Sequence, residues 1–271
     1  MGYLGHHLML RLEDDRVIAP GDSDRRILAR AVLERDRRFG LLAFGAADTH
    51  LHALATCDRR DAGHLARRIA LALQRKLSPG VPFAPTRVKP VTDQHHLANT
   101  FLYVLRQRSH HELASDPWRE ASNLPDLLGL RVTGLWTANG VRQHLPRVTR
   151  QQLTALFGAD LDAPIHSWDR LVEAALAAAC LDSLEGRSGN VVAARTAAVH
   201  AAGSCVAANR LAGLLGVGLR SVTRMRRRPA EPPLVQAILG QLRLRNQPLP
   251  SRPSSDRATE PRWDHDRPPS A

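Results

Sequence analysis

The chain has 271 residues, with 38 lysines and arginines against 26 aspartates and glutamates, so its formal net charge is +12. No apolar run approaches the roughly 18 residues of a membrane span, and three scattered cysteines without a C-x-x-C pair argue against a zinc ribbon or a disulfide framework. We therefore expect a cytoplasmic protein with no membrane partner, and the charge favours nucleic acid as a partner. A GC-rich genome would also produce an Arg-rich chain, so charge alone leaves this open.

Hydrophobic periodicity predicts strands and helices in alternation over the first 115 residues. The expected elements, in chain order, are a strand at 7–12, a helix at 21–38, strands at 39–47 and 49–57, a helix at 61–77, a short strand near 86–91 and a helix at 93–113. The order β-α-β-β-α-β-α is that of a ferredoxin-like βαββαβ domain with one added helix. The sequence thus predicts an α+β fold in its N-terminal part.

Composition divides the rest of the chain. From about residue 148 to residue 245 the sequence is Ala-rich with helical periodicity, and after that it is rich in Pro, Ser and Arg. A segment with so little to bury is expected to be disordered. The predicted organisation is an α+β domain at 1–130, a helical connector at 131–185, an all-α domain at 186–245 and a disordered tail at 246–271.

Two histidines stand one residue apart in the third predicted strand. Successive strand residues alternate between faces, so His50 and His52 share one face while Leu51 points to the other. Two neutral imidazoles on one face can share a divalent metal ion. The alternative is two ordinary polar positions on a half-exposed sheet, because a chain with 13 histidines can produce this spacing by chance.

The predicted helix at 93–113 carries one of the two tyrosines of the chain. At about 100° per residue, Tyr103 and Gln107 lie four residues apart on the polar flank, together with His96 and His110. A tyrosine on the polar side of an amphipathic helix is not a core residue, so it is either functional or a tyrosine at the rim of the core. The apolar stripe consists of Leu97, Phe101, Val104 and Leu105.

The H-L-H sequence at 50–52, followed by Y-V-L-R-Q at 103–107, resembles the HUH single-tyrosine transposases of the IS200/IS605 family and their REP-associated relatives. The resemblance covers about residues 3–130 and includes the segment DPWREASNLPDLLG at 116–129. It implies that His50, His52 and Gln107 hold Mg²⁺ or Mn²⁺ and that Tyr103 is the nucleophile. It further implies cleavage of single-stranded DNA beside a hairpin, a 5′-phosphotyrosine intermediate and a homodimer.

A second motif lies in the all-α part. Residues 212–224 read A-x-x-L-G-V-G-x-x-S-V-T-R, which matches a helix-turn-helix pattern with a positive-φ glycine at Gly216 and apolar wedge residues at Val217 and Val222. The second helix, about 219–228, is expected to enter the major groove of duplex DNA. Candidate base contacts are Arg220, Ser221 and Arg224, and candidate phosphate contacts are Arg226, Arg227 and Arg228. The alternative is a helical hairpin with a solvated basic face.

The leading hypothesis is a metal-dependent single-strand DNA nickase and strand transferase, located at the nucleoid through its DNA binding. The second is a regulator that keeps the transposase scaffold and binds DNA without catalysis. It is motivated by Ala47-Asp48-Thr49, which stands where the relatives usually carry Met-Pro-Asn. A third is a metal hydrolase unrelated to DNA, against which the net charge and the helix-turn-helix pattern both argue.

Overall fold

A four-stranded antiparallel sheet organises the N-terminal half of the computed structural model, which describes residues 2–34, 37–110, 116, 118–156, 158 and 160–248. The strand order is β2-β3-β1-β4, so the first strand lies between the third and the fourth. With the helices described below, this sheet confirms the predicted α+β class. The strands are β1 (Gly5–Arg11), β2 (Leu41–Ala47), β3 (His50–Ala55) and β4 (Arg87–Val91).

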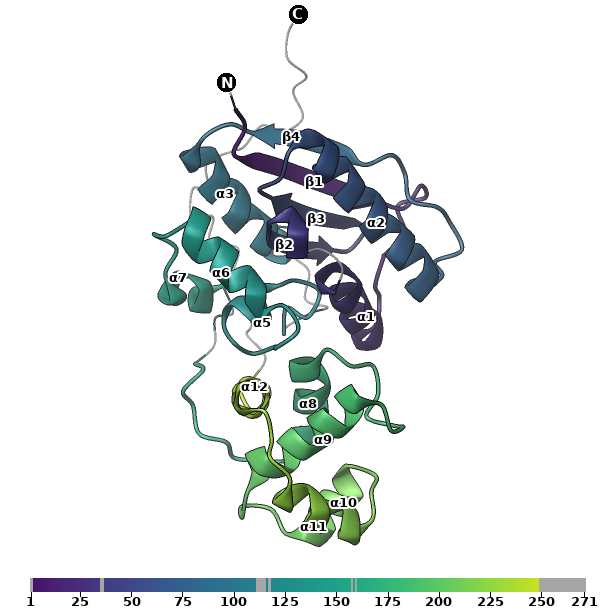
Figure 1. The fold of residues 1–271 in the computed structure, drawn as a ribbon, viewed down its shortest axis with the longest axis vertical. Helices are drawn as coiled ribbons and strands as arrows, with labels where there is room; N and C mark the ends of the chain where they lie inside the picture. Colours follow the sequence, from purple (N-terminus) through teal and green to yellow (C-terminus); the bar gives the residue numbers. More distant parts are fainter. Residues whose placement is uncertain are drawn as a thin grey trace, which may run out of the picture.

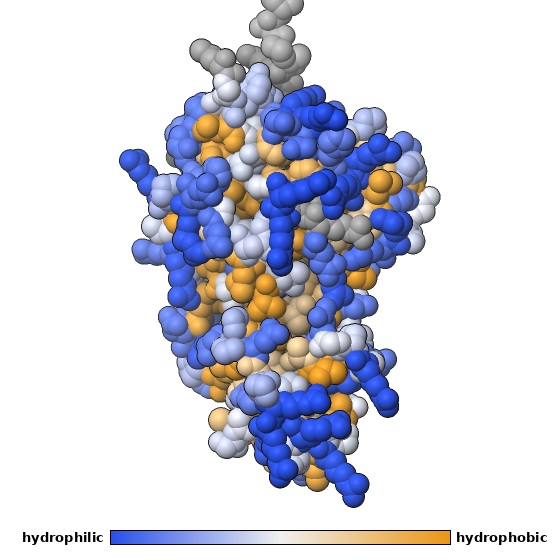
Figure 2. Space-filling model, in the orientation of Figure 1, coloured by the Kyte–Doolittle hydropathy of each residue, from blue (hydrophilic) through white to orange (hydrophobic). Residues whose placement is uncertain are grey.

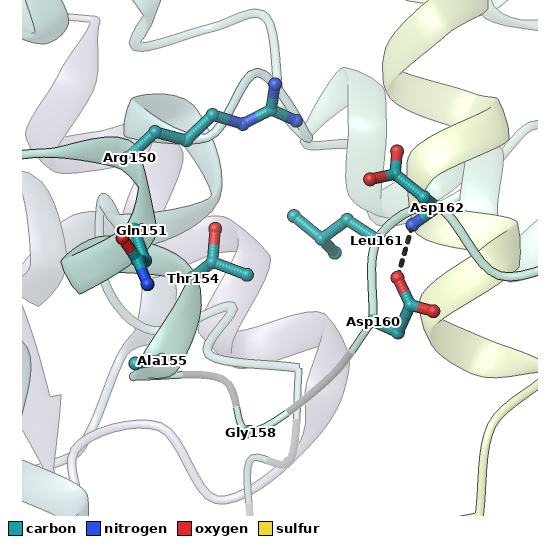
Figure 3. Close-up of a pocket in the computed structure, with 8 residues that line it drawn as sticks. All are labelled: Arg150, Gln151, Thr154, Ala155, Gly158, Asp160, Leu161 and Asp162. Carbon is teal, nitrogen blue, oxygen red and sulfur yellow. Dashed lines mark hydrogen bonds between the residues drawn. The ribbon is translucent and has the colours of Figure 1, made fainter.

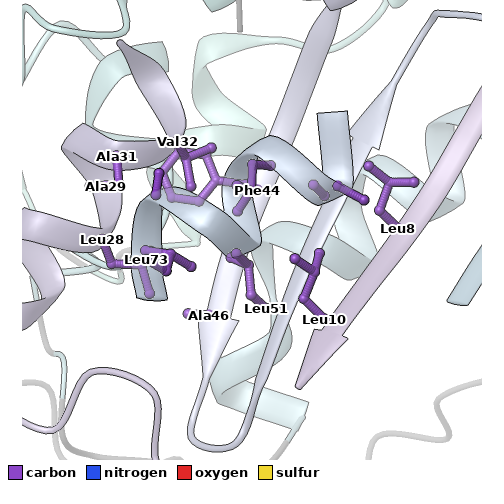
Figure 4. Close-up of a cluster of buried hydrophobic side chains, with 14 of the residues drawn as sticks. Leu8, Leu10, Leu28, Ala29, Ala31, Val32, Phe44, Ala46, Leu51 and Leu73 are labelled. Carbon is purple, nitrogen blue, oxygen red and sulfur yellow. The ribbon is translucent and has the colours of Figure 1, made fainter. Parts of the chain in front are cut away.

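Two amphipathic helices cover one face of this sheet (Figure 1). They are α1 (Asp22–Leu33) and α2 (Arg59–Leu77), and a short 3-10 helix, η1 (Arg37–Phe39), precedes β2. The residues Leu65, Ile69 and Leu73 recur at every fourth position of α2 and are fully buried. They pack with Leu8 and Leu10 of β1 in one hydrophobic cluster (Figure 4), so α1 and α2 bury the apolar side chains on this face of the sheet.

The opposite face is covered by α3 (Gln94–Leu105), which packs against β2 and β3. Phe101 and Val104 of this helix are buried with Leu42 and Leu54 of the sheet. Three short helices complete the cluster: α5 (Leu124–Leu127), α6 (Leu135–His144) and α7 (Arg150–Ala155). β1 and β4 lie beyond the strands that α3 contacts most.

The helix predicted at 93–113 is interrupted. Arg106 leaves the helical conformation with φ −96° and ψ 6°, and its N–H donates to the carbonyls of both Leu102 and Tyr103. Such shared bonds are common where a helix ends. A second short helix, α4 (Gln107–His110), follows, and residues 111–113 of the prediction lie outside the described part. Tyr103 and Gln107 therefore stand on two consecutive helices rather than on one face of a single helix.

The C-terminal half consists of helices around a second hydrophobic cluster (Figure 1). Its centre is an Ala-rich contact among α8 (Leu171–Ala179), α9 (Gly189–Ala202) and α12 (Pro232–Arg245), where small side chains allow close helix packing. α12 packs on both α8 and α9. Between α9 and α12 in the chain lie α10 (Ala208–Leu214) and α11 (Leu219–Arg227), and α11 packs on α9.

The segment predicted as a connector, 131–185, is divided between the two halves. Val141 and Leu153 pack in the cluster of α3, whereas Leu171 packs in the cluster of α9. The structure describes the predicted tail only to residue 248, so the prediction of disorder for 249–271 lies outside the described residues. Within the described ranges, no helix is both long enough and apolar enough to cross a membrane.

Candidate functional site

The histidine pair occupies the start of β3, on the face of the sheet that α3 covers. Leu51, between the two histidines, is fully buried in the cluster of α1 and α2, so strand alternation turns His50 and His52 to the opposite face. Their ring centroids are 6.2 Å apart. The two histidines share a face, as the sequence pattern predicted, and His52 is buried whereas His50 is half-buried.

A tight turn positions His50. β2 and β3 are joined by Asp48 and Thr49, and Asp48 has a φ of +53°, a region that short polar residues such as aspartate tolerate best. The hydroxyl Oγ1 of Thr49 lies 2.7 Å from Nδ1 of His50. This contact engages one ring nitrogen of His50 and leaves Nε2 as the nitrogen that can bind a metal ion or a substrate.

Tyr103 lies against the second histidine. Its ring meets the His52 ring edge to face, with centroids 5.7 Å apart and an interplanar angle of 89°. The close approach of α3 to the sheet depends on Gly45 of β2, which pairs with His52. A Cβ atom at Gly45 would lie 2.4 Å from the carbonyl oxygen of Val104, so a larger residue would push the helix away. The sequence prediction that Tyr103 and the histidine pair come together is thus consistent with this geometry.

Gln107 is buried. The sequence placed it on the polar flank of a single helix, but it lies in α4, which packs against β2, and only 1% of it is exposed. Its Nε2 donates to the carbonyl of Tyr103 at 3.3 Å. Its Oε1 is buried and accepts no hydrogen bond from any described residue. A buried acceptor without a donor calls for an explanation, and coordination of a cation is one.

His7 of β1 also contacts His52 and was not predicted from the sequence. Its Nε2 lies 3.0 Å from Nδ1 of His52, and the two rings are stacked with centroids 5.2 Å apart. The same ring meets the Tyr103 ring edge to face at 5.9 Å. The signal was the His6–His7 doublet in an alternating strand, which places one histidine on each face. His6 is buried on the other face, with Nδ1 3.0 Å from the carbonyl of Cys57.

The donor set fits a hard divalent cation. His50 and His52 offer imidazole nitrogens and Gln107 offers a carboxamide oxygen, which are ligands that Mg²⁺ or Mn²⁺ can take when water completes the shell. No group of three or more His, Cys, Asp or Glu side chains is gathered for metal binding anywhere in the described residues. The fit therefore rests on two histidines and the unpartnered Oε1 of Gln107.

The second predicted motif forms two helices joined by a tight turn. Gly216 in that turn has a φ of +61°, as the sequence predicted, and Val222 of α11 is fully buried against its neighbours. Figure 2 shows strongly hydrophilic side chains gathered at the end of the molecule where α10 and α11 lie. The exposed arginines of α11 and its C-cap are Arg220, Arg224, Arg226, Arg227 and Arg228.

Two of the predicted DNA contacts, Arg226 and Ser221, are more closely engaged with the rest of the protein than the other arginines of α11. Arg226 uses Nη2 to donate to the carbonyls of Val206 at 3.0 Å and Gly203 at 3.3 Å, so it ties α11 to the loop between α9 and α10. Ser221 is half-buried at the start of α11. The Nε2 of His200, from α9, lies 2.8 Å from the carbonyl of Arg228 and caps the other end of the helix. Arg226 thus has a structural contact within the protein, which the charge pattern could not reveal.

A buried ionic cluster joins the two halves, and the sequence analysis missed it. Glu120, only 2% exposed, pairs with Arg26 of α1 at 3.0 Å and with Arg245 of α12. Burial raises the pKa of Glu120, and the nearby Arg245 and Arg26 oppose that rise. Arg26 and Arg245 lie 94 and 125 positions from Glu120 along the chain, so no local sequence pattern could have predicted these ion pairs.

A pocket of about 510 Å³ lies beside α7 (Figure 3). Its described lining includes Arg150, Asp160 and Asp162, and the carboxylate of Asp160 accepts the N–H of Asp162 at 2.8 Å. None of the predicted site residues lines it.

No protein-family model, curated protein or solved structure matches this chain.

Proposed function

We propose that the protein is a metal-dependent single-strand DNA nickase and strand transferase of the HUH single-tyrosine type. The observation that carries the proposal is the contact between Tyr103 and His52, which joins the candidate nucleophile to the candidate metal ligands. The two residues lie 51 positions apart in the chain and come from different elements. A tyrosine beside a histidine pair, with a carboxamide side chain bonded to the carbonyl of that tyrosine, provides the types of group that a metal-assisted phosphoryl transfer needs.

The arrangement of the sheet supports the same proposal. The order β4-β1-β3-β2, with α1 and α2 on one face, is the arrangement expected for a ferredoxin-like βαββαβ domain. α3 is then the added helix, and it covers the opposite face. Tyr103 therefore sits on α3, the longest described helix on the face that carries His50 and His52.

In the proposed reaction, the phenol oxygen of Tyr103 attacks the phosphorus of a DNA phosphodiester. A bond forms between that oxygen and phosphorus, and the bond from phosphorus to the 3′-oxygen breaks. The phenol proton passes to solvent and the 3′-oxygen leaves as a hydroxyl, so the 5′ end is held as a phosphotyrosine. His50, His52 and Gln107 would hold Mg²⁺ or Mn²⁺, which supplies positive charge at the phosphoryl oxygens when bound. Reversal onto another 3′-hydroxyl transfers the strand.

The helix pair α10–α11 supports a duplex-DNA site of helix-turn-helix type. The exposed Arg220 and Arg224 lie on α11, and Arg227 and Arg228 lie at its end. Arginine suits bidentate contacts to guanine edges and to phosphates. We propose that this end of the molecule anchors the protein on duplex DNA beside the strand that is cut.

A covalent-adduct assay tests the proposal. Labelled hairpin DNA with single-stranded flanks is incubated with the protein and Mn²⁺, and a band that resists denaturant is sought with and without chelator. We expect a chelator-sensitive adduct that Tyr103→Phe abolishes. Tyr3→Phe is the matched control, because Tyr3 is the only other tyrosine and is 59% exposed. An adduct that survives Tyr103→Phe would refute the assignment of the nucleophile.

The second candidate is a regulator that binds DNA without cutting it. The exposed arginines of α11 favour it, because they need no metal ion and no tyrosine to bind duplex DNA. It predicts metal-independent duplex binding and no adduct over a broad panel of hairpins. A metal-dependent nick that Tyr103→Phe abolishes would rule it out.

A further inference from the structure

His7 contacts both of the groups on which the proposed chemistry depends. Its ring stacks on His52 at 5.2 Å and meets the ring of Tyr103 edge to face at 5.9 Å. The backbone register fixes this position, because His7 lies between Leu54 of β3 and Lys89 of β4 in the sheet. The ring is therefore held by a central strand and not by a loop.

The hydrogen bond between the two imidazoles limits their protonation patterns. Nε2 of His7 and Nδ1 of His52 are 3.0 Å apart, and a bond between neutral rings needs a proton on one nitrogen and a lone pair on the other. If Nδ1 of His52 carries the proton, its Nε2 has a lone pair for a metal ion. If Nε2 of His7 carries the proton, Nε2 of His52 is protonated and cannot be a ligand.

We propose that His7 is a positioning residue that accepts the Nδ1 proton of His52 and so presents the Nε2 lone pair of His52 to the cation. The assignment of the proton to Nδ1 of His52 rests on the hydrogen bond to His7, whereas the role of His52 as a metal ligand rests on the proposed function. Metal-binding histidines commonly donate their second N–H to a partner that fixes the ring, and His7 takes that place here.

The first histidine of the pair is held in the same way. Oγ1 of Thr49 lies 2.7 Å from Nδ1 of His50, and a hydroxyl oxygen can accept the proton of that nitrogen. Both histidines are thus engaged through Nδ1, one by Thr49 and the other by His7. The direction that we assign to the bond between His7 and His52 puts the proton of His52 on Nδ1, the nitrogen through which His50 also contacts its partner.

The tautomer of His52 can be measured without metal or DNA. Long-range ¹⁵N–¹H NMR of the full chain, at a pH about two units above the ordinary histidine pKa, reports which ring nitrogen carries the proton. We expect the Nδ1–H form in the native protein and in His7→Gln, whose carboxamide oxygen can replace the acceptor. In His7→Leu we expect a shift toward the Nε2–H form. A native His52 protonated at Nε2, or no shift in His7→Leu, would overturn the proposal.

Mn²⁺ binding followed by electron paramagnetic resonance provides the second measurement. We expect affinity about 10- to 100-fold weaker in His7→Leu and near native in His7→Gln, the usual range for loss of such a partner. His7→Asn, whose shorter side chain cannot place an acceptor at the Nε2 position, should resemble His7→Leu and serves where His7→Leu does not fold. Equal affinities in native and loss variants would refute the metal-binding part of the proposal. A native protein that binds no Mn²⁺ and forms no adduct would instead refute the proposed function, with the tautomer result judged separately.

Discussion

Arg131 and Asp126 form an ion pair with both side chains buried, at 1% and 0% exposure. Nε of Arg131 lies 3.1 and 3.0 Å from the two carboxylate oxygens. Arg131 also donates through Nη1 to the carbonyl of Glu120 at 2.8 Å, and the Asp126 carboxylate accepts the N–H of Gly134 at 2.7 Å. This pair therefore ties α5, which holds Asp126, to the segment that leads into α6.

Removing either partner should destabilise the fold strongly. Arg131→Met leaves a buried carboxylate without its cation, and Asp126→Asn leaves a buried guanidinium without its anion. We expect each to lower the free energy of unfolding by about 3–5 kcal/mol, measured by urea denaturation. Arg170→Ala is the control, because its pair with Glu173 is about half exposed and should be worth less than about 1 kcal/mol. Equal losses in the three variants would contradict the role of the buried pair.

Local periodicity accounts for most of the predicted fold. The strands and the two helices α1 and α2 follow from alternation and from apolar residues at every third or fourth position. Their ends were predicted to within about two residues, except that the helix predicted at 21–38 already ends at Leu33. The break at Arg106 was missed, because no proline or glycine marks it and the apolar pattern continues on either side. The buried contacts of Glu120 were missed because its partners come from both ends of the chain.

The candidate site was predictable only in part, for the same reason. His50, His52 and Tyr103 could be proposed from spacing within single elements and from resemblance. His7 could not be joined to them, because its contact depends on β1 pairing beside β3, and strand order is not written in any one segment. The burial of Gln107 likewise depends on the packing of α4 against β2.

Gly45 should be intolerant of any side chain. A Cβ atom there would lie 2.4 Å from the backbone oxygen of Val104, so Gly45→Ala has to displace α3 from the sheet. We expect a loss of about 1–3 kcal/mol in unfolding free energy and a weaker Tyr103 adduct. Gly63→Ala is the matched control, because nothing lies within 4 Å of its added Cβ in α2, and alanine should stabilise that helix by about 0.5–1 kcal/mol. Native-like stability of Gly45→Ala would contradict the close approach.

The three cysteines should differ in their reaction with a thiol reagent. Burial raises the pKa of Cys57 and of Cys180 to about 11, whereas Cys205 is exposed. Because the thiolate is the reactive form, a pKa of about 11 leaves about one part in a thousand reactive at pH 8. We expect one cysteine per chain to react rapidly in the native protein and this reaction to be lost in Cys205→Ser. In denaturant we expect all three cysteines to react. The Cys57 rate should rise about tenfold per pH unit up to its pKa, and rapid labelling of two or more native thiols would contradict this.

The arginines of α11 should separate into DNA contacts and structural residues. Selection from a random duplex library supplies the probe, and binding is measured over a range of salt concentrations. Arg224→Ala should cost about 1–3 kcal/mol on the selected sequence and relax its specificity, whereas Arg227→Ala should weaken all sequences and lower the salt slope by about one.

Arg226→Ala is the informative comparison, because it removes the same charge from the same helix. Its Nη2 is bonded to the carbonyls of Val206 and Gly203, so its loss should lower the unfolding free energy more than Arg227→Ala does. If Arg226→Ala kept native stability and reduced DNA binding as Arg227→Ala does, Arg226 would be a phosphate contact like its neighbour. If none of the three variants altered duplex binding, α11 would not be the element that meets DNA.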